Sequence, residues 1–169
     1  MDMIWDFVYG RYGSRDAQQI IPAIQRVIAR AREEGVPVVY LQDAHHPDDR
    51  ELTVWGEHAM EGSRGSQIID ELRPAGEDTV IKKRHFSGFV NTNLEEVLRR
   101  KNASHLVFTG VSTDICVQNN VAEAYFRGFD TTVVEDATAS ITPEAHSYAL
   151  EYMRRVYGAR IVNSRGEIF

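Results

Sequence analysis

The sequence predicts an α/β fold in which helices cover both faces of a mainly parallel β-sheet. Short apolar runs alternate along the chain with longer segments whose apolar residues recur at helical spacing. Each apolar run is separated from the next by a segment that can form a helix. Neighbouring parallel strands require a crossover connection of this kind. We therefore expect a single domain over residues 1–169, built as a three-layer α/β/α sandwich.

The predicted strands are the short apolar runs. The run Leu106-Val107-Phe108 contains no polar residue, as expected for a strand that is buried on both faces. It ends at Thr109-Gly110, where glycine permits a turn. The predicted strands span residues 38–41, 79–82, 106–108, 131–134 and 160–162.

The predicted helices begin and end at residues that favour helix termini. Apolar residues recur at helical spacing from residue 20 to 31, where Pro22 suits the first turn and Gly35 the C-terminal stop. Gly128 and Gly158 end two later helices in the same way. The other predicted helices are a short one at 66–72, one capped at 91 or 92, one at 116–127 and one at 143–157.

Composition and charge exclude several classes of protein. With 43% hydrophobic and 26% charged residues, the chain has the composition of an ordinary globular protein. Its formal net charge of −6 argues against a nucleic-acid partner or an anionic membrane surface. No apolar stretch reaches the roughly 20 residues of a membrane span, and the first residues lack the regions of a signal peptide. Because the single cysteine cannot form an intramolecular disulfide, we expect a cytoplasmic protein.

Reactive side chains follow the predicted strands. Asp43, Lys83 and Cys116 lie just past the carboxyl ends of three of them. Open parallel sheets bind ligands outside these ends, so we expect the three side chains to converge. Cys116 also falls in the first turn of a predicted helix, where free N–H groups and the helix dipole favour a thiolate. Asp2 would hold a similar position if an apolar strand preceded it.

A cysteine nucleophile needs a neighbouring base or cation. Lys83 is a candidate for the cation that stabilises the thiolate, and Asp2 for the group that takes and returns a proton. Each residue also has a plainer interpretation. Lys83 can belong to a solvated basic run, Asp2 can be an exposed aspartate, and Cys116 can be a small buried apolar residue. Their shared position at strand ends favours a catalytic site.

The irregular segment at 45–65 is rich in side chains that bind metals. Carboxylates and imidazoles at this density suit zinc, iron or manganese, although the same residues can form a solvated loop. Trp55 in this segment can pack in the core or stack on a flat substrate ring. The potential ligands in and next to the segment are Asp43, His45, His46, Asp48, Asp49, Glu51 and His58.

Four segments together resemble the isochorismatase-like cysteine hydrolases, and among these the nicotinamidases, in particular archaeal ones. The segments are Asp-Met-Ile-Trp-Asp-Phe at 2–7, Asp-Ala-His at 43–45 with Trp-Gly-Glu-His at 55–58, Lys-Arg-His-Phe-Ser-Gly-Phe at 83–89, and Thr-Gly-Val-Ser-Thr-Asp-Ile-Cys at 109–116. They follow the order of the family and span nearly the whole chain. The resemblance implies the isochorismatase-like hydrolase fold.

The resemblance also implies a catalytic triad of aspartate, lysine and cysteine, which here is Asp2, Lys83 and Cys116. It implies a cis peptide bond between Val111 and Ser112 in the turn before the cysteine. The backbone N–H groups of Ser112 and Cys116 then form an oxyanion hole.

A metal site and a substrate site follow from the same resemblance. The metal is a divalent ion, zinc by expectation with iron or manganese as alternatives, and no organic cofactor is implied. The implied metal ligands are Asp43, His45, His58 and, as the best-spaced fourth ligand, Glu51. The residues implied to contact the substrate are Phe7, Trp55 and Val111.

The implied reaction is the hydrolysis of nicotinamide to nicotinate and ammonia through a thioester on Cys116. A carbamoyl or ureido compound, or another small amide, is the alternative substrate, because residues 87–92 are also similar to ureidoacrylate-type amidohydrolases. Vinyl-ether hydrolysis of the isochorismate type fits less well, because those enzymes lack the cysteine nucleophile. Two interpretations carry no amidase activity: a non-catalytic family member that acts as a binding subunit, and a redox-sensing thiol.

The resemblance further implies a homo-oligomer, either a dimer or a tetramer. Its binding partner other than its own copies is the substrate, a small-molecule amide. It also implies an apolar first strand, central in the sheet, directly before Asp2. Only Met1 precedes Asp2 in this sequence, so we expect the sheet to lack that strand.

Overall fold

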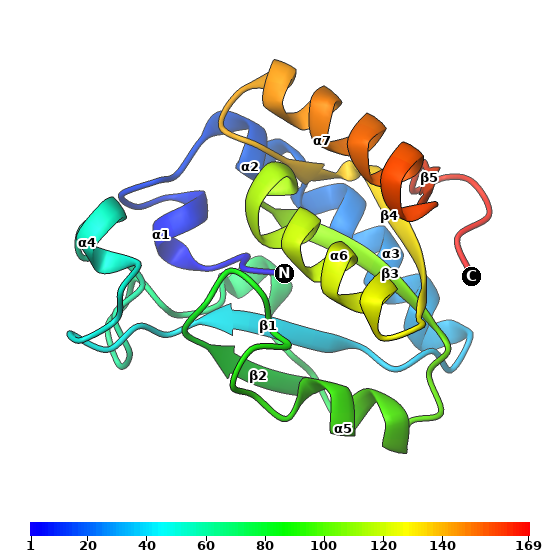
Figure 1. Cartoon of the computed structure of the whole chain (residues 1–169), viewed down its shortest axis with the longest axis horizontal. Coiled ribbons are helices and arrows are strands. Elements are labelled where there is room, and N and C mark those ends of the chain that lie inside the picture. Colours follow the sequence, from blue (N-terminus) through cyan, green and yellow to red (C-terminus); the bar gives the residue numbers. More distant parts are fainter.

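The computed structural model describes residues 1–169 and shows an α/β fold whose strands all pair in parallel. The sheet has two parts (Figure 1). In the first part β1 (Val39–Asp43) pairs with β2 (Thr79–Lys83). In the second part β4 (Asp130–Ala139) lies between β3 (His105–Val111) and β5 (Arg160–Val162). The predicted strands are thereby confirmed, and all of them except β5 extend further than predicted.

Met1 and Asp2 lie between the two parts of the sheet. The Met1 nitrogen donates to the Thr109 oxygen at 2.9 Å, and the Val111 N–H donates to the Met1 oxygen at 3.1 Å. On the other side, the Asp2 N–H donates to the Leu41 oxygen at 2.9 Å. The N-terminus is therefore in the interior of the molecule (Figure 1). No strand of the structure precedes β1, as the sequence predicts.

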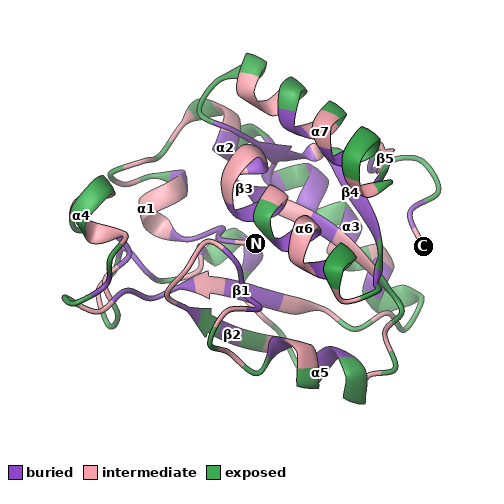
Figure 2. Cartoon of the chain, viewed as in Figure 1, coloured by how far each residue is buried: buried purple, intermediate pink, exposed green.

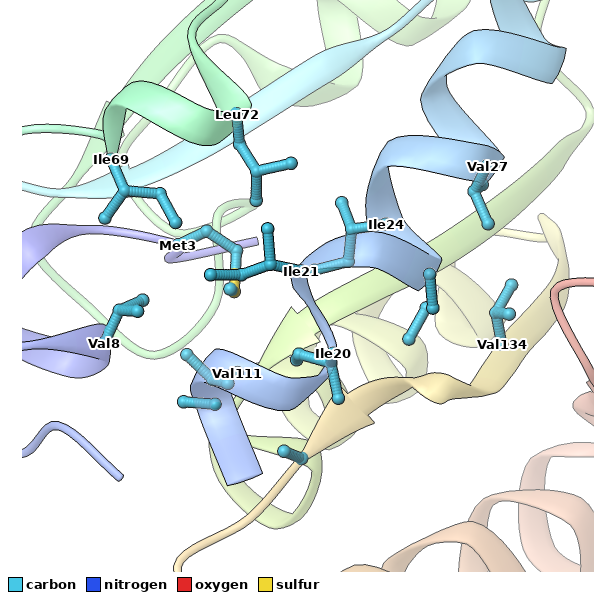
Figure 3. Packing of buried hydrophobic residues seen from close by; sticks show 14 of the residues in the cluster. Met3, Val8, Ile20, Ile21, Ile24, Val27, Ile69, Leu72, Val111 and Val134 are labelled. Atoms are coloured by element: carbon cyan, nitrogen blue, oxygen red, sulfur yellow. The ribbon is translucent and has the colours of Figure 1, made fainter. Parts of the chain in front are cut away.

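Helices pack on both faces of the sheet and form two hydrophobic clusters (Figure 2). On one face, α2 (Arg15–Gln19) and α3 (Ile21–Glu33) contribute apolar residues at helical spacing, including Ile21, Ile24 and Val27 (Figure 3). The other cluster contains residues of α5 (Leu94–Arg100), α6 (Gln118–Phe126) and α7 (Pro143–Tyr157). Burial of each such aliphatic side chain contributes about 1.5–3 kcal/mol. None of the helices combines the length and the apolar character of a membrane span.

Helix termini follow the predicted signals in part. Pro143 and the left-handed Gly158 bound α7, and the Thr142 side chain accepts a hydrogen bond from the Ala145 N–H. By contrast, only Asp70–Leu72 of the predicted helix at 66–72 is helical, as a short 3-10 turn. Of the preceding residues, Ser66 and Gln67 lie in a turn and a bend, and Ile68 forms an antiparallel bridge with Ile4. The backbone here bonds to the segment after Asp2 instead of forming a helix. Three short helices were not predicted: α1 (Trp5–Val8), α2 and α4 (Leu52–Trp55).

Gly110 allows the N-terminal residues to approach β3. Its φ is +105°, and a Cβ atom built there would lie 2.0 Å from the Met1 oxygen. We expect Gly110→Ala to lower the free energy of unfolding in urea by about 3 kcal/mol or more. The added methyl group would clash with backbone atoms of Met1, which cannot move aside as a flexible side chain can. Gly76→Ala is the matched control, because Gly76 also has a positive φ but no atom lies within 4 Å of its Cβ position. Equal losses in the two variants would contradict this packing.

Candidate active site

Cys116 lies in a π-helical turn, Thr113–Val117, between β3 and α6. The sequence predicts an α-helix from residue 116, and the structure corrects this, since α6 begins only at Gln118. The Val117 N–H donates to the Ser112 oxygen five residues back, which widens the turn. The peptide bond between Val111 and Ser112 is cis, as the resemblance implies. The Ser112 N–H donates no hydrogen bond to another group of the chain.

Lys83 is a fully buried lysine at the carboxyl end of β2. Its Nζ lies 2.8 Å from an Asp2 carboxylate oxygen and 2.5 Å from an Asp43 carboxylate oxygen. It also donates to the His85 oxygen at 3.1 Å and lies 3.8 Å from the Cys116 sulfur. A buried ammonium is stable only when it is paired in this way.

Asp2 is placed by backbone and side-chain hydrogen bonds rather than by a strand of its own. Its Oδ1 accepts a hydrogen bond from the Asp43 N–H at 3.0 Å, which ties it to the end of β1. Its other oxygen faces Lys83. The carboxylates of Asp2 and Asp43 and the sulfur of Cys116 all lie within 4.8 Å of one another. The structure therefore brings Asp2, Lys83 and Cys116 together, as the resemblance implies.

The charges of the site explain its protonation. Burial alone would lower the pKa of Lys83, but the carboxylates of Asp2 and Asp43 outweigh it and raise the pKa well above its ordinary value. Lys83 is therefore a permanent cation. Burial raises the pKa of the Cys116 thiol well above its ordinary value, and the Lys83 charge opposes this only in part. The thiol is therefore protonated at rest, and its activation requires a neighbouring base.

A cluster of metal-binding side chains lies beside this group. One potential ligand atom from each of Asp43, His45 and His58 lies within 4.8 Å of the others, and all three residues are buried. The Nε2 of His45 is 3.8 Å from an Asp43 carboxylate oxygen and 3.8 Å from a Glu51 carboxylate oxygen. The four residues that the resemblance implies as metal ligands therefore gather at one place.

Hydrogen bonds orient the two imidazoles toward the centre of this cluster. The Nδ1 of His45 bonds to an Asp49 carboxylate oxygen at 2.9 Å, and the Nδ1 of His58 bonds to the Gly56 oxygen at 2.8 Å. Both Nε2 atoms are then left to bind a ligand. Burial lowers the pKa of His58, which favours the neutral imidazole that metals bind.

Unpaired buried atoms show that the cluster fits a cation. The Nε2 of His45 and a carboxylate oxygen of Glu51 are buried without a hydrogen-bond partner. Burial, and next the charge of Asp43, raises the pKa of Glu51 to about 7. Burial, and next the charge of Asp2, likewise raises the pKa of Asp43 to about 7. Two histidines and two carboxylates form a nitrogen and oxygen ligand set that suits zinc, iron or manganese.

A small cavity of about 80 Å³ opens onto Cys116 and the cluster. All three predicted substrate contacts, Phe7, Trp55 and Val111, line it. No lysine or arginine lines it, so no side chain is placed to pair with a substrate carboxylate. Its other aromatic and aliphatic lining residues are Tyr12, Ala17, Phe86, Ile115, Ala139 and Ile141.

Several residues of the site have no clear signal in the sequence. The Tyr12 ring packs edge to face against Trp55 and His58, with distances between ring centroids of 5.9 Å and 5.4 Å. The sequence around Tyr12 is typical of a loop and does not indicate these contacts. Asp49 is among the potential metal ligands that the sequence indicates, but its carboxylate instead bonds to the Nδ1 of His45, a contact that the sequence does not indicate. Asn120 lies within the predicted helix at 116–127, and nothing in the sequence distinguishes it from a polar residue on the surface of that helix.

Asn120 is buried and fastens the turn that carries Cys116 to the loop after Lys83. Its side-chain oxygen accepts a hydrogen bond from the Gly88 N–H at 2.9 Å. Its amide nitrogen donates to the Phe86 oxygen at 2.9 Å and to the Cys116 oxygen at 2.8 Å. This amide therefore sets the spacing between two segments that the sequence separates widely.

Asp49 provides a test of the cluster that does not depend on turnover. We expect Asp49→Asn to weaken zinc binding by about 10–100-fold, because the carboxylate orients His45 and raises its basicity. Titration calorimetry of the metal-free protein with zinc measures the affinity. Asp48→Asn is the matched control, because the Asp48 side chain is 82% exposed and contacts only Arg84. Unchanged affinity in Asp49→Asn would contradict a zinc site at His45.

Comparison with known proteins places the chain in a family. The family of isochorismatase domains matches residues 1–165. A ureidoacrylate amidohydrolase of Yersinia enterocolitica is 30% identical over 161 residues, which cover 82% of this chain and 70% of the relative. One from Cronobacter sakazakii is 32% identical over 145 residues, covering 73% of this chain and 62% of the relative. The chain thus spans about two thirds of the length of these relatives.

Solved structures of similar proteins share the fold over nearly the whole chain. N-carbamoylsarcosine amidase of Thermoplasma acidophilum is 40% identical with a TM-score of 0.93, covering 98% of this chain and 94% of that one. A nicotinamidase of Bacillus subtilis is 28% identical with a TM-score of 0.89, covering 96% of each chain. Pyrazinamidase of Pyrococcus horikoshii, in complex with zinc, is 26% identical with a TM-score of 0.87, covering 96% and 95%. The chain therefore belongs to the isochorismatase family, as the four sequence segments predict.

Proposed function

We propose that the chain is a cysteine amidohydrolase that releases ammonia from a terminal –CO–NH2 group of a small substrate. One observation carries this proposal: a buried lysine and a buried aspartate lie together beside the only cysteine, which itself lines a small cavity. Nζ of Lys83 is 2.8 Å from Asp2 and 3.8 Å from the sulfur of Cys116. A nucleophile, a base and a fixed cation are the groups that acyl transfer needs.

In the proposed mechanism Asp2 takes the thiol proton of Cys116, and the Lys83 ammonium stabilises the thiolate. The sulfur then attacks the carbonyl carbon, and the backbone N–H groups of Ser112 and Cys116 hold the negative oxygen. The C–N bond breaks as Asp2 returns its proton to the nitrogen, which leaves as ammonia. Asp2 next takes a proton from water, whose oxygen attacks the acyl carbon. The C–S bond then breaks, the acid leaves, and Asp2 returns the proton to the sulfur of Cys116.

Asp43, His45, Glu51 and His58 would hold a divalent cation, of which zinc is the expected one. When bound, such a cation supplies a Lewis acid that can bind a lone pair of the substrate. The chain itself supplies the orientation of that site, through the hydrogen bond between His45 and Asp49. Phe7, Tyr12 and Trp55 provide the walls that restrict the substrate to a small flat group.

The favoured substrate class is a carbamoyl or ureido compound. Support comes from the relatives, since the names of the Yersinia and Thermoplasma proteins specify ureidoacrylate and N-carbamoylsarcosine. Both names describe a substrate with a terminal –NH–CO–NH2 or –N–CO–NH2 group. The nicotinamide expected from the sequence takes second place, because the nicotinamidase structures are less similar to this chain.

Nicotinamide stays a candidate because of the cavity lining. Ureidoacrylate and N-carbamoylsarcosine carry a carboxylate, and no lysine or arginine lines the cavity to pair with it. Nicotinamide is uncharged, and its flat ring suits the aromatic walls formed by Phe7 and Trp55. Its ring nitrogen also offers a lone pair for a cation held by the cluster.

An ammonia-release assay with four compounds tests the proposal and separates the substrate classes. Ureidoacrylate, N-carbamoylsarcosine, nicotinamide and pyrazinamide are compared at equal concentrations, with and without added zinc. We expect turnover of at least one compound, with the carbamoyl or ureido compounds fastest, and a loss of at least about 1000-fold in Cys116→Ala. Activity that survives in folded Cys116→Ala would contradict the cysteine mechanism. Turnover of nicotinamide alone would reverse the order of the two substrate classes.

The family resemblance supports a homo-oligomeric enzyme, either a dimer or a tetramer. A non-catalytic binding subunit and a redox-sensing thiol are less consistent with the site. A binding subunit has no need of a fully buried lysine between two carboxylates. A redox-sensing thiol is exposed and acidic, whereas Cys116 is buried and its pKa is raised.

A further inference from the structure

Asp6 is an acidic residue next to the candidate site that the proposed mechanism does not use. It lies in α1, which packs beside the irregular segment that follows β1 (Figure 1). The Asp6 N–H donates to the Gly65 oxygen at 3.0 Å, and the Asp6 oxygen accepts a hydrogen bond from the Tyr12 N–H at 2.8 Å. The backbone of Asp6 is therefore fixed between the end of the irregular segment and the loop that contains Tyr12.

The side chain of Asp6 bonds to the backbone of the irregular segment. Its Oδ2 accepts a hydrogen bond from the Ala59 N–H at 2.8 Å. Ala59 is fully buried and follows His58 directly in the chain. The carboxylate of Asp6 therefore acts on the peptide unit next to a histidine of the metal cluster.

The backbone at Ala59 depends on its hydrogen bonds because its conformation is unfavourable. Its φ is +45°, in the left-handed region that residues with a side chain rarely adopt. A residue in this region keeps its conformation only when the surrounding structure holds it. The Ala59 N–H bonds to Asp6, and the Ala59 oxygen accepts a hydrogen bond from the His45 N–H at 2.9 Å. Ala59 is thus held between Asp6 and the other histidine of the cluster.

The bond to Asp6 therefore bears on the placement of both histidines. Beyond Ala59 the chain continues to pair with the end of β1, through a parallel bridge between His45 and Met60 and a bond from the Glu61 N–H to the His45 oxygen. His58 lies on the other side of Ala59, and its ring centroid is 4.7 Å from that of His45. The backbone angles of Ala59 consequently set the position of the His58 imidazole relative to His45.

Two glycines leave room for the Asp6 carboxylate. A Cβ atom built at Gly10 would lie 2.5 Å from the Asp6 Oδ1, and one built at Gly65 would lie 2.6 Å from the Asp6 Cγ. Neither glycine has a positive φ, so it is space and not backbone conformation that a side chain would lack there. A methyl group at Gly65 would therefore push the carboxylate away from the Ala59 N–H.

We propose that Asp6 is a positioning residue of the metal cluster, whose carboxylate holds the Ala59 N–H and thereby places His58 where it can bind a divalent cation together with His45. The inference rests on the metal site of the proposed function. Asp6 itself is not one of the four potential ligands, and it does not line the cavity. It acts through the backbone, whereas the bond from the His58 Nδ1 to the Gly56 oxygen orients the ring.

Titration calorimetry of the metal-free chain with zinc tests this role. We expect Asp6→Ala to weaken zinc binding at least about 10-fold, which is the usual effect of removing an outer contact of a metal ligand. Asp6→Asn should stay within about 3-fold of wild type, because its amide oxygen can still accept the Ala59 N–H. Asp136→Ala is the matched control, since Asp136 also accepts a backbone N–H, that of Ser164 at 2.7 Å, but belongs to no metal cluster.

A second variant makes the same test without removing a charge. Gly65→Ala should also weaken zinc binding at least about 10-fold, because the added methyl group displaces the carboxylate. In an Asp6→Ala background the same substitution should have no further effect, since the carboxylate that it displaces is absent.

A double-mutant cycle with His58 separates positioning from a general loss of structure. In a His58→Ala background, Asp6→Ala should weaken zinc binding less than about 3-fold, because the ligand that it positions is already removed. A merely structural role would give the same loss in both backgrounds. Urea unfolding of each metal-free variant checks that it is folded.

Three results would overturn the inference. Asp6→Ala and Gly65→Ala bind zinc as the wild-type chain does, Asp6→Asn binds as weakly as Asp6→Ala, or the loss in Asp6→Ala is the same with and without His58. Absence of zinc binding by the wild-type chain would overturn the metal site together with this inference. Failure of the proposed amidase activity is a separate result, because no readout here depends on ammonia release.

Discussion

The burial of the Lys83 ammonium between two carboxylates is the interaction on which the site depends. Its Nζ lies 2.8 Å from Asp2 and 2.5 Å from Asp43, and no part of the side chain is exposed. A buried lysine is destabilising unless such partners are present, and the carboxylates are equally destabilising without the lysine. The three charges therefore hold the ends of β1 and β2 and the N-terminal residues in one arrangement, and Cys116 lies 3.8 Å from the same nitrogen.

Asp43 joins the charges around Lys83 to the potential metal cluster. It faces Lys83 through one oxygen and His45 through the other, at 2.5 Å and 3.8 Å. The carboxylates of Asp2, Asp43 and Glu51 outnumber the single cation of Lys83 in this buried region, and burial raises the pKa of both Asp43 and Glu51 to about 7. A divalent cation between Asp43, His45, Glu51 and His58 would balance these charges, which gives the cluster a reason to sit directly beside the thiol.

The sequence was most informative where a side chain follows a strand. Asp43, Lys83 and Cys116 converge because parallel strands direct their carboxyl ends to one edge, and this is visible in the alternation of apolar runs. Asp2 was assigned by resemblance, because no strand precedes it. The π-helical turn at Cys116, the bond from Asp49 to His45 and the bonds of Asn120 to the loop after Lys83 could not be predicted. The π-helical turn depends on a hydrogen bond that spans five residues instead of four. The contacts of Asp49 and Asn120 depend on how the folded chain places one side chain against another.

Substitution of neighbouring lysines tests the central role of Lys83 most directly. Lys82 and Lys83 are adjacent in β2, but the Lys82 side chain is 57% exposed and pairs with Glu61 at the surface. We expect Lys83→Met to lower the free energy of unfolding by about 3–5 kcal/mol, because it leaves buried carboxylates unpaired. It should also lower kcat/KM for ammonia release at least about 100-fold, whereas Lys82→Met should stay near wild type in both measurements. Folded Lys83→Met with the stability and turnover of Lys82→Met would contradict the account.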